Sequence, residues 1–265
     1  FSITKSVVSL LVGAAIKDGY IKSVNELAAS HLPELRGGSY QEASIKDLLQ
    51  MSSGVAWNEG YDNLGSDIVK APVVGLPLFR YMSGLPRTAK SGTVWNYNTN
   101  ETNLIGELLS RAIDQDLSAY LENKIWQPYG MESEANWMLT YENGLEYGGC
   151  CLSATLRDYA RLGLFVLDEL KKAPDDDSVL PPGWMRESLS PAPAFNGYGY
   201  FWWLLGEGIY AAEGIFGQVI WIDSNNELVI ALQSSWRQAW SDSLEAEWMA
   251  FMGALSKELL GENRL

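Results

Sequence analysis

The hydrophobic periodicity of this chain changes once, near residue 196, and this change constrains the fold more than any other feature. Before it, apolar residues mostly recur at the three-to-four-residue spacing of helices. From Tyr198 they recur at the two-residue spacing of strands. We expect strands at 198–205, 208–212, 218–223 and 227–234, joined by turns into an antiparallel meander. A helix at 241–260, with Leu244, Trp248, Phe251, Leu255 and Leu259 on one apolar face, then packs on that sheet.

The chain is therefore predicted to be a single α+β domain over 1–265, mainly helical over 1–195, with antiparallel strands and a terminal helix over 196–265. Residues 2–18 are apolar on nearly all sides, which predicts a buried helix. Sequences typical of capping boxes predict two more helix N-termini, at Ser44–Asp47 and Thr155–Asp158. Further helices are expected at 100–113, 117–125 and around Trp184, and residues 55–92 form a long loop region able to cover a site.

Composition excludes several classes of function. The 33 acidic and 19 basic residues give a net charge of -14, which argues against nucleic acid as a partner because phosphate binding depends on clustered Lys and Arg. No stretch reaches the roughly 18 uncharged apolar residues of a membrane span. With His31 as the one histidine, neither a zinc site nor a Ser-His-Asp scheme is expected. We predict no metal and no cofactor, and a structural role for His31.

The two cysteines, Cys150 and Cys151, are adjacent. Neighbours in sequence do not easily adopt ordinary disulfide geometry, so we expect no disulfide. A cytoplasmic setting is compatible with this pair, although the sequence does not establish the compartment. The chain starts at Phe1 without an initiator Met or signal peptide, and we therefore expect it to be part of a longer protein.

Ser2 and Lys5 are the first candidates for catalysis. They lie three residues apart at the head of the buried helix, so the lysine amine can reach the serine oxygen. A helix N-terminus favours a developing oxyanion, and burial favours a neutral, basic lysine. The pair alone is equally compatible with an N-cap serine beside a surface lysine.

Two further clusters can carry chemistry. Residues 92–100 form a polar turn before a helix and contain Tyr97, which is either core filling or a phenol that relays protons. Residues 212–218 place glycines inside a strand pattern, which indicates a bulge or a backbone brought close to a ligand. An exposed amide there can donate to an oxyanion.

In this order, the Ser-x-x-Lys pair, the tyrosine and the Gly-rich strand resemble the serine β-lactamase and penicillin-recognising hydrolase superfamily. Residues 34–54, 92–99, 148–161 and 214–218 resemble its class C-related branch, which includes 6-aminohexanoate-dimer hydrolases and carboxylesterases. The resemblance covers essentially the whole chain. It implies a β-lactamase-like α+β fold, with an antiparallel sheet flanked by helices and a mostly helical subdomain, and it implies that Cys150 and Cys151 pack in the core.

The resemblance also implies roles for individual residues. Ser2 is expected to be the nucleophile, Lys5 its proton partner and Tyr97 the general base and acid. The oxyanion hole is expected at the backbone amides of Ser2 and Ile215. The family's sheet contains strands that precede the nucleophile, so the resemblance further implies about a hundred N-terminal residues that complete the domain.

The sequence departs from the family pattern at two places. The Tyr-x-Asn motif appears as Tyr97-Asn98-Thr99, so Asn98, Thr99 or Asn100 is expected to hold the substrate. The Lys-Thr-Gly motif appears as Ala212-Glu213-Gly214, with Gly214 kept for substrate binding. This change removes a cation and adds an anion, which favours esters or uncharged amides over penicillins. Arg237 could replace the lost charge, but an exposed loop arginine is the simpler interpretation.

The predicted function is a serine hydrolase that forms an acyl-enzyme on a small-molecule amide or ester. One alternative is a β-lactamase or D-Ala-D-Ala peptidase, and the other is a sensor or binding domain that is acylated without turnover. The natural substrate stays open. An oligomer is compatible with the sequence.

Overall fold

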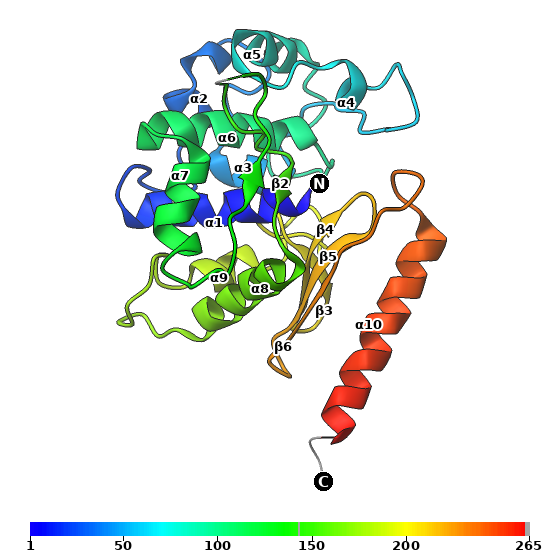
Figure 1. Cartoon of the computed structure of the whole chain (residues 1–265). Coiled ribbons are helices and arrows are strands. Elements are labelled where there is room, and N and C mark those ends of the chain that lie inside the picture. Colours follow the sequence, from blue (N-terminus) through cyan, green and yellow to red (C-terminus); the bar gives the residue numbers. More distant parts are fainter. Residues whose placement is uncertain (143, 263–265) are drawn as a thin grey trace.

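The computed structural model describes residues 1–142 and 144–262 and has the α+β architecture that the change of period predicts (Figure 1). Helices predominate before residue 196, and a four-stranded sheet and a terminal helix follow. The helical part contains α1 (Ile3–Lys17), α2 (Ala28–His31), η1 (Pro33–Leu35), α3 (Ile45–Leu49), α4 (Asp67–Lys70), α5 (Gly75–Gly84), α6 (Thr99–Ile113), α7 (Leu117–Leu121), η2 (Glu122–Trp126), α8 (Leu156–Lys171) and α9 (Trp184–Ser188). A two-stranded ribbon, β1 (Asn136–Trp137) and β2 (Leu152–Ser153), interrupts these helices.

The main sheet is an antiparallel meander, as predicted. Its strands are β3 (Trp203–Gly206), β4 (Ile209–Gly214), β5 (Gln218–Asp223) and β6 (Leu228–Leu232), and their order in space is their order in sequence. Ala211 on β4 pairs with Trp221 on β5, which in turn pairs with Ile230 on β6. Within the described residues, no helix combines the length and the apolar character that crossing a membrane requires.

Alternate residues of the sheet face two different layers. Ala212, Ile220 and Ile222 belong to the larger core, together with α1 and α8. Their neighbours Ala211, Val219 and Trp221 pack against Trp248 and Met252 of α10 (Asp242–Glu262). The sheet thus lies between α1 and α8 on one side and α10 on the other, as Figure 1 shows.

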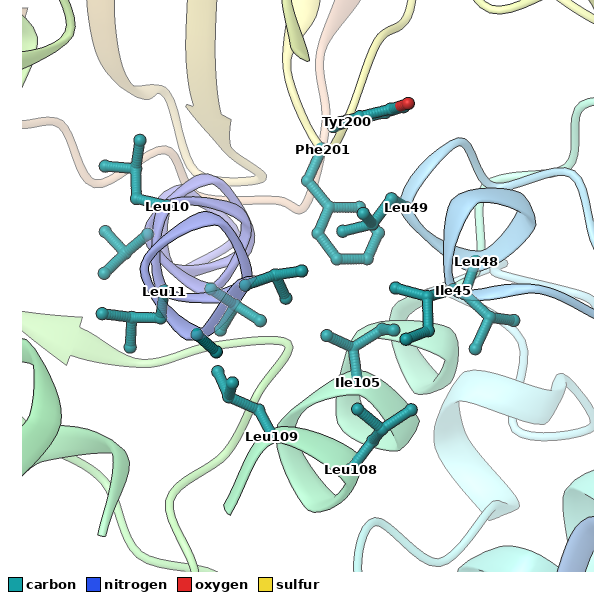
Figure 2. Packing of buried hydrophobic residues seen from close by; sticks show 14 of the residues in the cluster. Leu10, Leu11, Ile45, Leu48, Leu49, Ile105, Leu108, Leu109, Tyr200 and Phe201 are labelled. Carbon is teal, nitrogen blue, oxygen red and sulfur yellow. The ribbon is translucent and has the colours of Figure 1, made fainter. Parts of the chain in front are cut away.

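Helix α1 lies at the centre of the molecule. Every residue from Ile3 to Ala15 is buried, because α6 covers one side of the helix and strands β4 and β5 cover another. Figure 2 shows α1, which carries Leu10 and Leu11, with Leu109 of α6 directed toward it. The prediction of a helix buried on all sides is confirmed, and the head of this helix carries Ser2 and Lys5.

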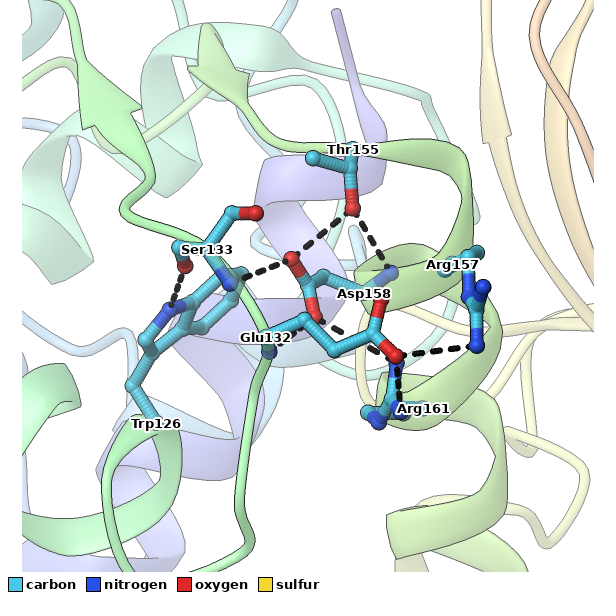
Figure 3. A network of polar contacts seen from close by, with 7 residues as sticks. All are labelled: Trp126, Glu132, Ser133, Thr155, Arg157, Asp158 and Arg161. Atoms are coloured by element: carbon cyan, nitrogen blue, oxygen red, sulfur yellow. Dashed lines mark hydrogen bonds and ion pairs between the residues drawn. The ribbon is translucent and has the colours of Figure 1, made fainter.

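The two predicted capping boxes differ in completeness. At α3 the box is reciprocal, since Ser44 Oγ accepts from Asp47 N at 3.1 Å and Asp47 Oδ2 accepts from Ser44 N at 2.8 Å. At α8, Thr155 Oγ1 accepts from Asp158 N at 3.1 Å, but the carboxylate of Asp158 instead accepts from the backbone N–H groups of residues 132 and 133 (Figure 3). Asp158 therefore ties the start of α8 to the segment before β1.

The predicted strand over 198–205 is wrong in its first five residues. Tyr198, Tyr200, Phe201 and Trp202 are all at most 2% exposed, and Phe201 has a left-handed backbone with φ of 59°. The backbone N–H groups of Tyr200 and Phe201 donate to Ser188 and Leu49 in the helical part. Buried aromatic anchors that alternate with glycine thus mimic the two-residue period of a strand.

Candidate active site

Ser2 and Lys5 lie together at the N-terminal end of α1. Ser2 is 7% exposed and Lys5 is 1% exposed, and Lys5 Nζ donates to Ser2 Oγ at 2.8 Å. The Ser2 side chain makes no capping hydrogen bond to α1. The interpretation of this pair as an N-cap serine beside a surface lysine is therefore excluded.

Lys5 Nζ also donates to the backbone carbonyl of Gly149 at 2.9 Å and lies 5.2 Å from the centre of the Tyr97 ring. Burial lowers the pKa of Lys5 to about 8, while the charge of Glu59 raises it. About a tenth of the Lys5 amine is thus neutral at pH 7, far more than for an exposed lysine, and this is the state that can accept a proton.

Tyr97 is half-buried in an aromatic cluster. Its ring stacks on Trp203 at a centroid distance of 5.8 Å and an interplanar angle of 17°, and Trp95 and Tyr198 also contact it. Burial raises the pKa of Tyr97 far above its usual value, the charge of Glu59 adds to this, and the Ser2 hydroxyl acts in the opposite direction. The phenol is therefore protonated in the resting site.

The three candidates that follow Tyr97 occupy different environments. Asn98 is 1% exposed and caps α6, because its side-chain oxygen accepts from Asn100 N at 2.9 Å and Glu101 N at 3.2 Å. Asn100 is also 1% exposed and donates its amide to Pro72 O at 3.0 Å. Thr99 lines the same cleft as Ser2, and it is the one of the three that does so.

Glu59 is a residue of the site that the sequence analysis missed. Its carboxylate accepts from Thr99 N at 3.0 Å, from Tyr61 OH at 2.6 Å, and from Trp57 Nε1 and Thr99 Oγ1. These bonds join the long loop over 55–92 to the start of α6. The available signal was a carboxylate between two aromatic residues, which no periodic pattern distinguishes from other loop sequences.

The turn after β4 brings backbone amides to the cleft. Ser2 and Ile215 both line the cleft, and within the described residues neither of their backbone N–H groups donates to a protein acceptor. Gly217 supports this turn with φ of 83°, and a Cβ there would lie 2.3 Å from the Trp236 ring. Gly214, expected to bind substrate, is buried and does not itself line the cleft.

The cleft has a volume of about 590 Å³ and open access to solvent. Its walls come from six separate stretches of chain. They are Phe1 and Ser2; Tyr61, Asp62 and Ile68; Thr99; Gly149 and Cys150; Ile215 and Phe216; and Arg237, Gln238 and Ala239. The predicted loop region over 55–92 thus contributes one wall.

The charges around this cleft differ from those expected. Glu213 does not line the cleft, because β4 alternates and turns its side chain toward the layer of α10. Burial, assisted by the charge of Glu245, raises the pKa of Glu213 to about 8, so it is mostly neutral at pH 7. The predicted anion is thus not part of the cleft wall, although its charged form raises the pKa of Tyr97. Arg237 is exposed, as predicted, and lines the cleft.

The two cysteines correct another expectation. Cys150 and Cys151 form a disulfide between neighbouring residues, and both are half-buried rather than packed in the core. The turn between Gly149 and Leu152 brings the two sulfur atoms together, a local geometry that adjacency in sequence did not exclude. Cys150 lines the cleft beside Ser2.

The chain is similar to proteins of one family along almost its whole length. The family model described as Beta-lactamase matches residues 1–251. The 6-aminohexanoate-dimer hydrolase of Paenarthrobacter ureafaciens is 25% identical over 259 residues, which cover 89% of this chain and 65% of that protein. The chain thus spans slightly less than two thirds of this relative's length.

Two solved structures show the same fold. A Bacillus anthracis protein, provisionally assigned as a 6-aminohexanoate-dimer hydrolase, superimposes with a TM-score of 0.81 at 20% identity, over 98% of this chain and 72% of that one. A family VIII carboxylesterase superimposes with a TM-score of 0.67 at 13% identity, over 91% of this chain and 79% of that one. The fold is β-lactamase-like, and the chain belongs to the Beta-lactamase family.

Proposed function

We propose that this chain carries the catalytic site of a serine hydrolase that forms an acyl-enzyme on small amides or esters. The observation that carries the proposal is the buried 2.8 Å contact between Lys5 Nζ and Ser2 Oγ in an otherwise accessible cleft. A serine hydroxyl is a weak nucleophile until an adjacent base accepts its proton, and Lys5 lies where such a base is needed.

The proposed reaction begins with neutral Lys5. Lys5 accepts the proton of Ser2 as the serine oxygen attacks the substrate carbonyl, and the backbone amides of Ser2 and Ile215 stabilise the resulting oxyanion. Tyr97, protonated at rest, donates its proton to the departing amine or alcohol and regains one from the Lys5 ammonium. Water then attacks the acyl-enzyme by the same proton route in reverse, which releases the acid and restores Ser2.

Small uncharged amides and esters, the preferred substrates in this proposal, agree with the strand residues. Ala212, at the position of the family's lysine, is buried, and Glu213 points away from the cleft. The relatives named 6-aminohexanoate-dimer hydrolase and family VIII carboxylesterase agree with these two substrate classes. Arg237 in the cleft wall is the observation that favours the alternative, a β-lactamase or peptidase acting on substrates with a carboxylate.

The first experiment combines fluorophosphonate labelling with turnover of short-chain p-nitrophenyl esters and a linear amide dimer. We expect a single adduct on Ser2, and we expect Ser2→Ala to lower kcat by about 10⁴-fold or more. Tyr97→Phe is expected to lower kcat by roughly 10²- to 10⁴-fold. Ser9→Ala, on the same helix, and the exposed Tyr141→Phe are the matched controls and retain activity.

Absence of a Ser2 adduct, or full activity in Tyr97→Phe, contradicts the proposal. A chromogenic cephalosporin distinguishes the β-lactamase alternative, which predicts faster turnover of the cephalosporin than of any ester. A stable acyl adduct on Ser2 without product release would instead identify a sensor or binding domain.

A further inference from the structure

We propose that the disulfide between Cys150 and Cys151 is a redox-modifiable site in the wall of the cleft, and that it holds the Gly149 carbonyl in place against Lys5. The inference rests on the proposed function, because its main readout is turnover at Ser2. Its consequence is that a dithiol reductant lowers the activity of the protein without touching a residue of the proton route.

The position of the disulfide places it next to the reacting groups. Cys150 lines the cleft together with Ser2, and Gly149, the residue directly before it, accepts from Lys5 Nζ at 2.9 Å. Ser2 Oγ at 2.8 Å is the other acceptor of the Lys5 amine. The disulfide is thus one residue away from one of the two hydrogen bonds that orient Lys5.

The backbone around the disulfide has little freedom on either side. Gly149 N donates to Asn103 Oδ1 at 2.9 Å, and a Cβ on Gly149 would lie 2.5 Å from Thr99 Cγ2. After the disulfide, Leu152 N donates to Thr4 Oγ1 on α1 at 3.0 Å. Both ends of the segment are therefore attached close to the Ser2–Lys5 pair. We expect a shift of the backbone between them to move the Gly149 carbonyl that accepts from Lys5.

Reduction changes the space that the two sulfur atoms need. Two thiols cannot remain as close as two bonded sulfurs, so the side chains separate and the backbone between Gly149 and Leu152 adjusts. The Gly149 carbonyl then loses its fixed direction toward Lys5. A displacement of about 1 Å in a positioning group is enough to lower a rate by up to roughly 100-fold.

The reaction at this site is thiol–disulfide exchange with a dithiol. A thiolate of the reductant attacks Cys150 Sγ, the bond to Cys151 breaks, and Cys151 Sγ leaves as a thiolate that takes a proton. The second thiol of the reductant then attacks the mixed disulfide and frees Cys150. Two electrons and two protons reach the protein, and the reductant is oxidised to its cyclic disulfide. Both cysteines are half-buried, so a small dithiol has access.

The test compares the chain before and after treatment with dithiothreitol. Intact mass after alkylation measures the thiols, fluorophosphonate labels Ser2, and kcat/KM is measured against pH on an ester. We expect no alkylation before reduction and two alkylated cysteines after it. The plateau of kcat/KM is expected to fall roughly tenfold. Its acidic limb moves to lower pH, because Lys5 loses an acceptor that stabilises its charged form.

The double variant Cys150→Ser with Cys151→Ser is the matched control. It should show the lower plateau without treatment and no response to dithiothreitol. The inference fails if the untreated chain already carries two free thiols, or if oxidised and reduced forms share one kcat and one pH profile while Ser2 is labelled in both. A chain whose Ser2 is not labelled in either form contradicts the proposed function instead.

Discussion

Lys5 combines a charge with an almost complete lack of contact with solvent. Two oxygen acceptors and the face of an aromatic ring replace water around its amine. Desolvation nevertheless outweighs the attraction of Glu59, so the pKa is lowered to about 8. The pKa of the amine is thus close to neutral pH, where a group both accepts and releases protons readily.

The first prediction concerns the pH dependence of activity. A base must be neutral, and Lys5 is protonated below its pKa, so kcat/KM is expected to fall about tenfold per pH unit below about pH 8. Above that pH the rate should reach a plateau, because the neutral amine is then the main form. Initial rates on a neutral ester between pH 5 and pH 10 measure this fall of kcat/KM on the acidic side. A flat profile through this range would contradict the role of Lys5.

Glu59 provides a sharper version of the same test. Its charge raises the pKa of Lys5, so Glu59→Gln should move the acidic limb to lower pH. Asp62→Asn is the matched control, since Asp62 lies in the same loop and cleft wall but is not among the charges that shift Lys5. An equal shift in both variants would indicate a general change of charge rather than the contact between Glu59 and the site.

At the residue scale, the sequence predicted contacts that are local and missed those that depend on the path of a loop. Ser2 and Lys5 are three residues apart on one helix, so their contact follows from helical geometry. Glu59 meets Thr99 across 40 residues, and its partners are set by the fold of an irregular segment. The disulfide was missed for the opposite reason, because a general rule on disulfide geometry was applied to a tight local turn.

Helix α10 is predicted correctly in its extent and in its packing on the sheet. Its rotation about its own axis, which decides the face that meets the sheet, is predicted wrongly. The sequence analysis expected one apolar face against the sheet. The structure buries Trp248, Met252 and Ser256, which follow each other at four-residue steps, and leaves Phe251 55% exposed. Ser256 contributes a hydrogen bond from its hydroxyl to Asp223 at 3.4 Å, a contact that hydrophobicity does not predict.

The second prediction uses this rotation. Trp248 is 7% exposed and packs on Trp221 and Val219, so Trp248→Ala is expected to lower the free energy of unfolding by roughly 2–4 kcal/mol. Phe251→Ala, three residues along the same helix, should cost less than about 1 kcal/mol. Urea unfolding of both variants measures the difference. Equal losses would mean that α10 packs through the face expected from its sequence.

The beginning of the sheet illustrates why elements are misassigned. Residues 197–200 alternate glycine and tyrosine in a two-residue period like that of a strand, but only an isolated bridge joins Tyr198 to Trp203. The aromatic side chains instead insert between α1, α3 and α9, as Figure 2 shows for Phe201 near Leu49. The two-residue period is visible in the sequence, but the pockets that receive these rings also depend on α1 and α3, which lie more than a hundred residues away in the chain.

At the scale of the whole molecule, the helical part over 1–195 and the strands over 196–265 share one core. Residues of α1, α3, α6 and α8 form a single buried cluster with Phe201, Ile220 and Ile222. We propose on this ground that the chain behaves as one domain, as its sequence predicts. The expected N-terminal segment and the oligomer compatible with the sequence stay predictions.

The third prediction follows from the shared core. Unfolding in urea should show one transition, with the same midpoint for helix content by far-UV circular dichroism and for aromatic packing by near-UV circular dichroism. Two transitions, with the sheet and α10 melting before the helical part, would contradict a single domain. The variant Trp248→Ala should move both signals together if the proposal is right.

The positions of the cleft walls have a consequence for redesign. Ser2 and Lys5, the proposed nucleophile and base, lie at the start of a helix that the core surrounds on all sides, whereas much of the cleft wall lies on separate loops near 61–68, 215–216 and 237–239. The loops at these three places could be replaced singly or together without changing the positions of Ser2 and Lys5. If the proposed site is right, we expect directed evolution of these loops to change the substrate range with little effect on the catalytic rate.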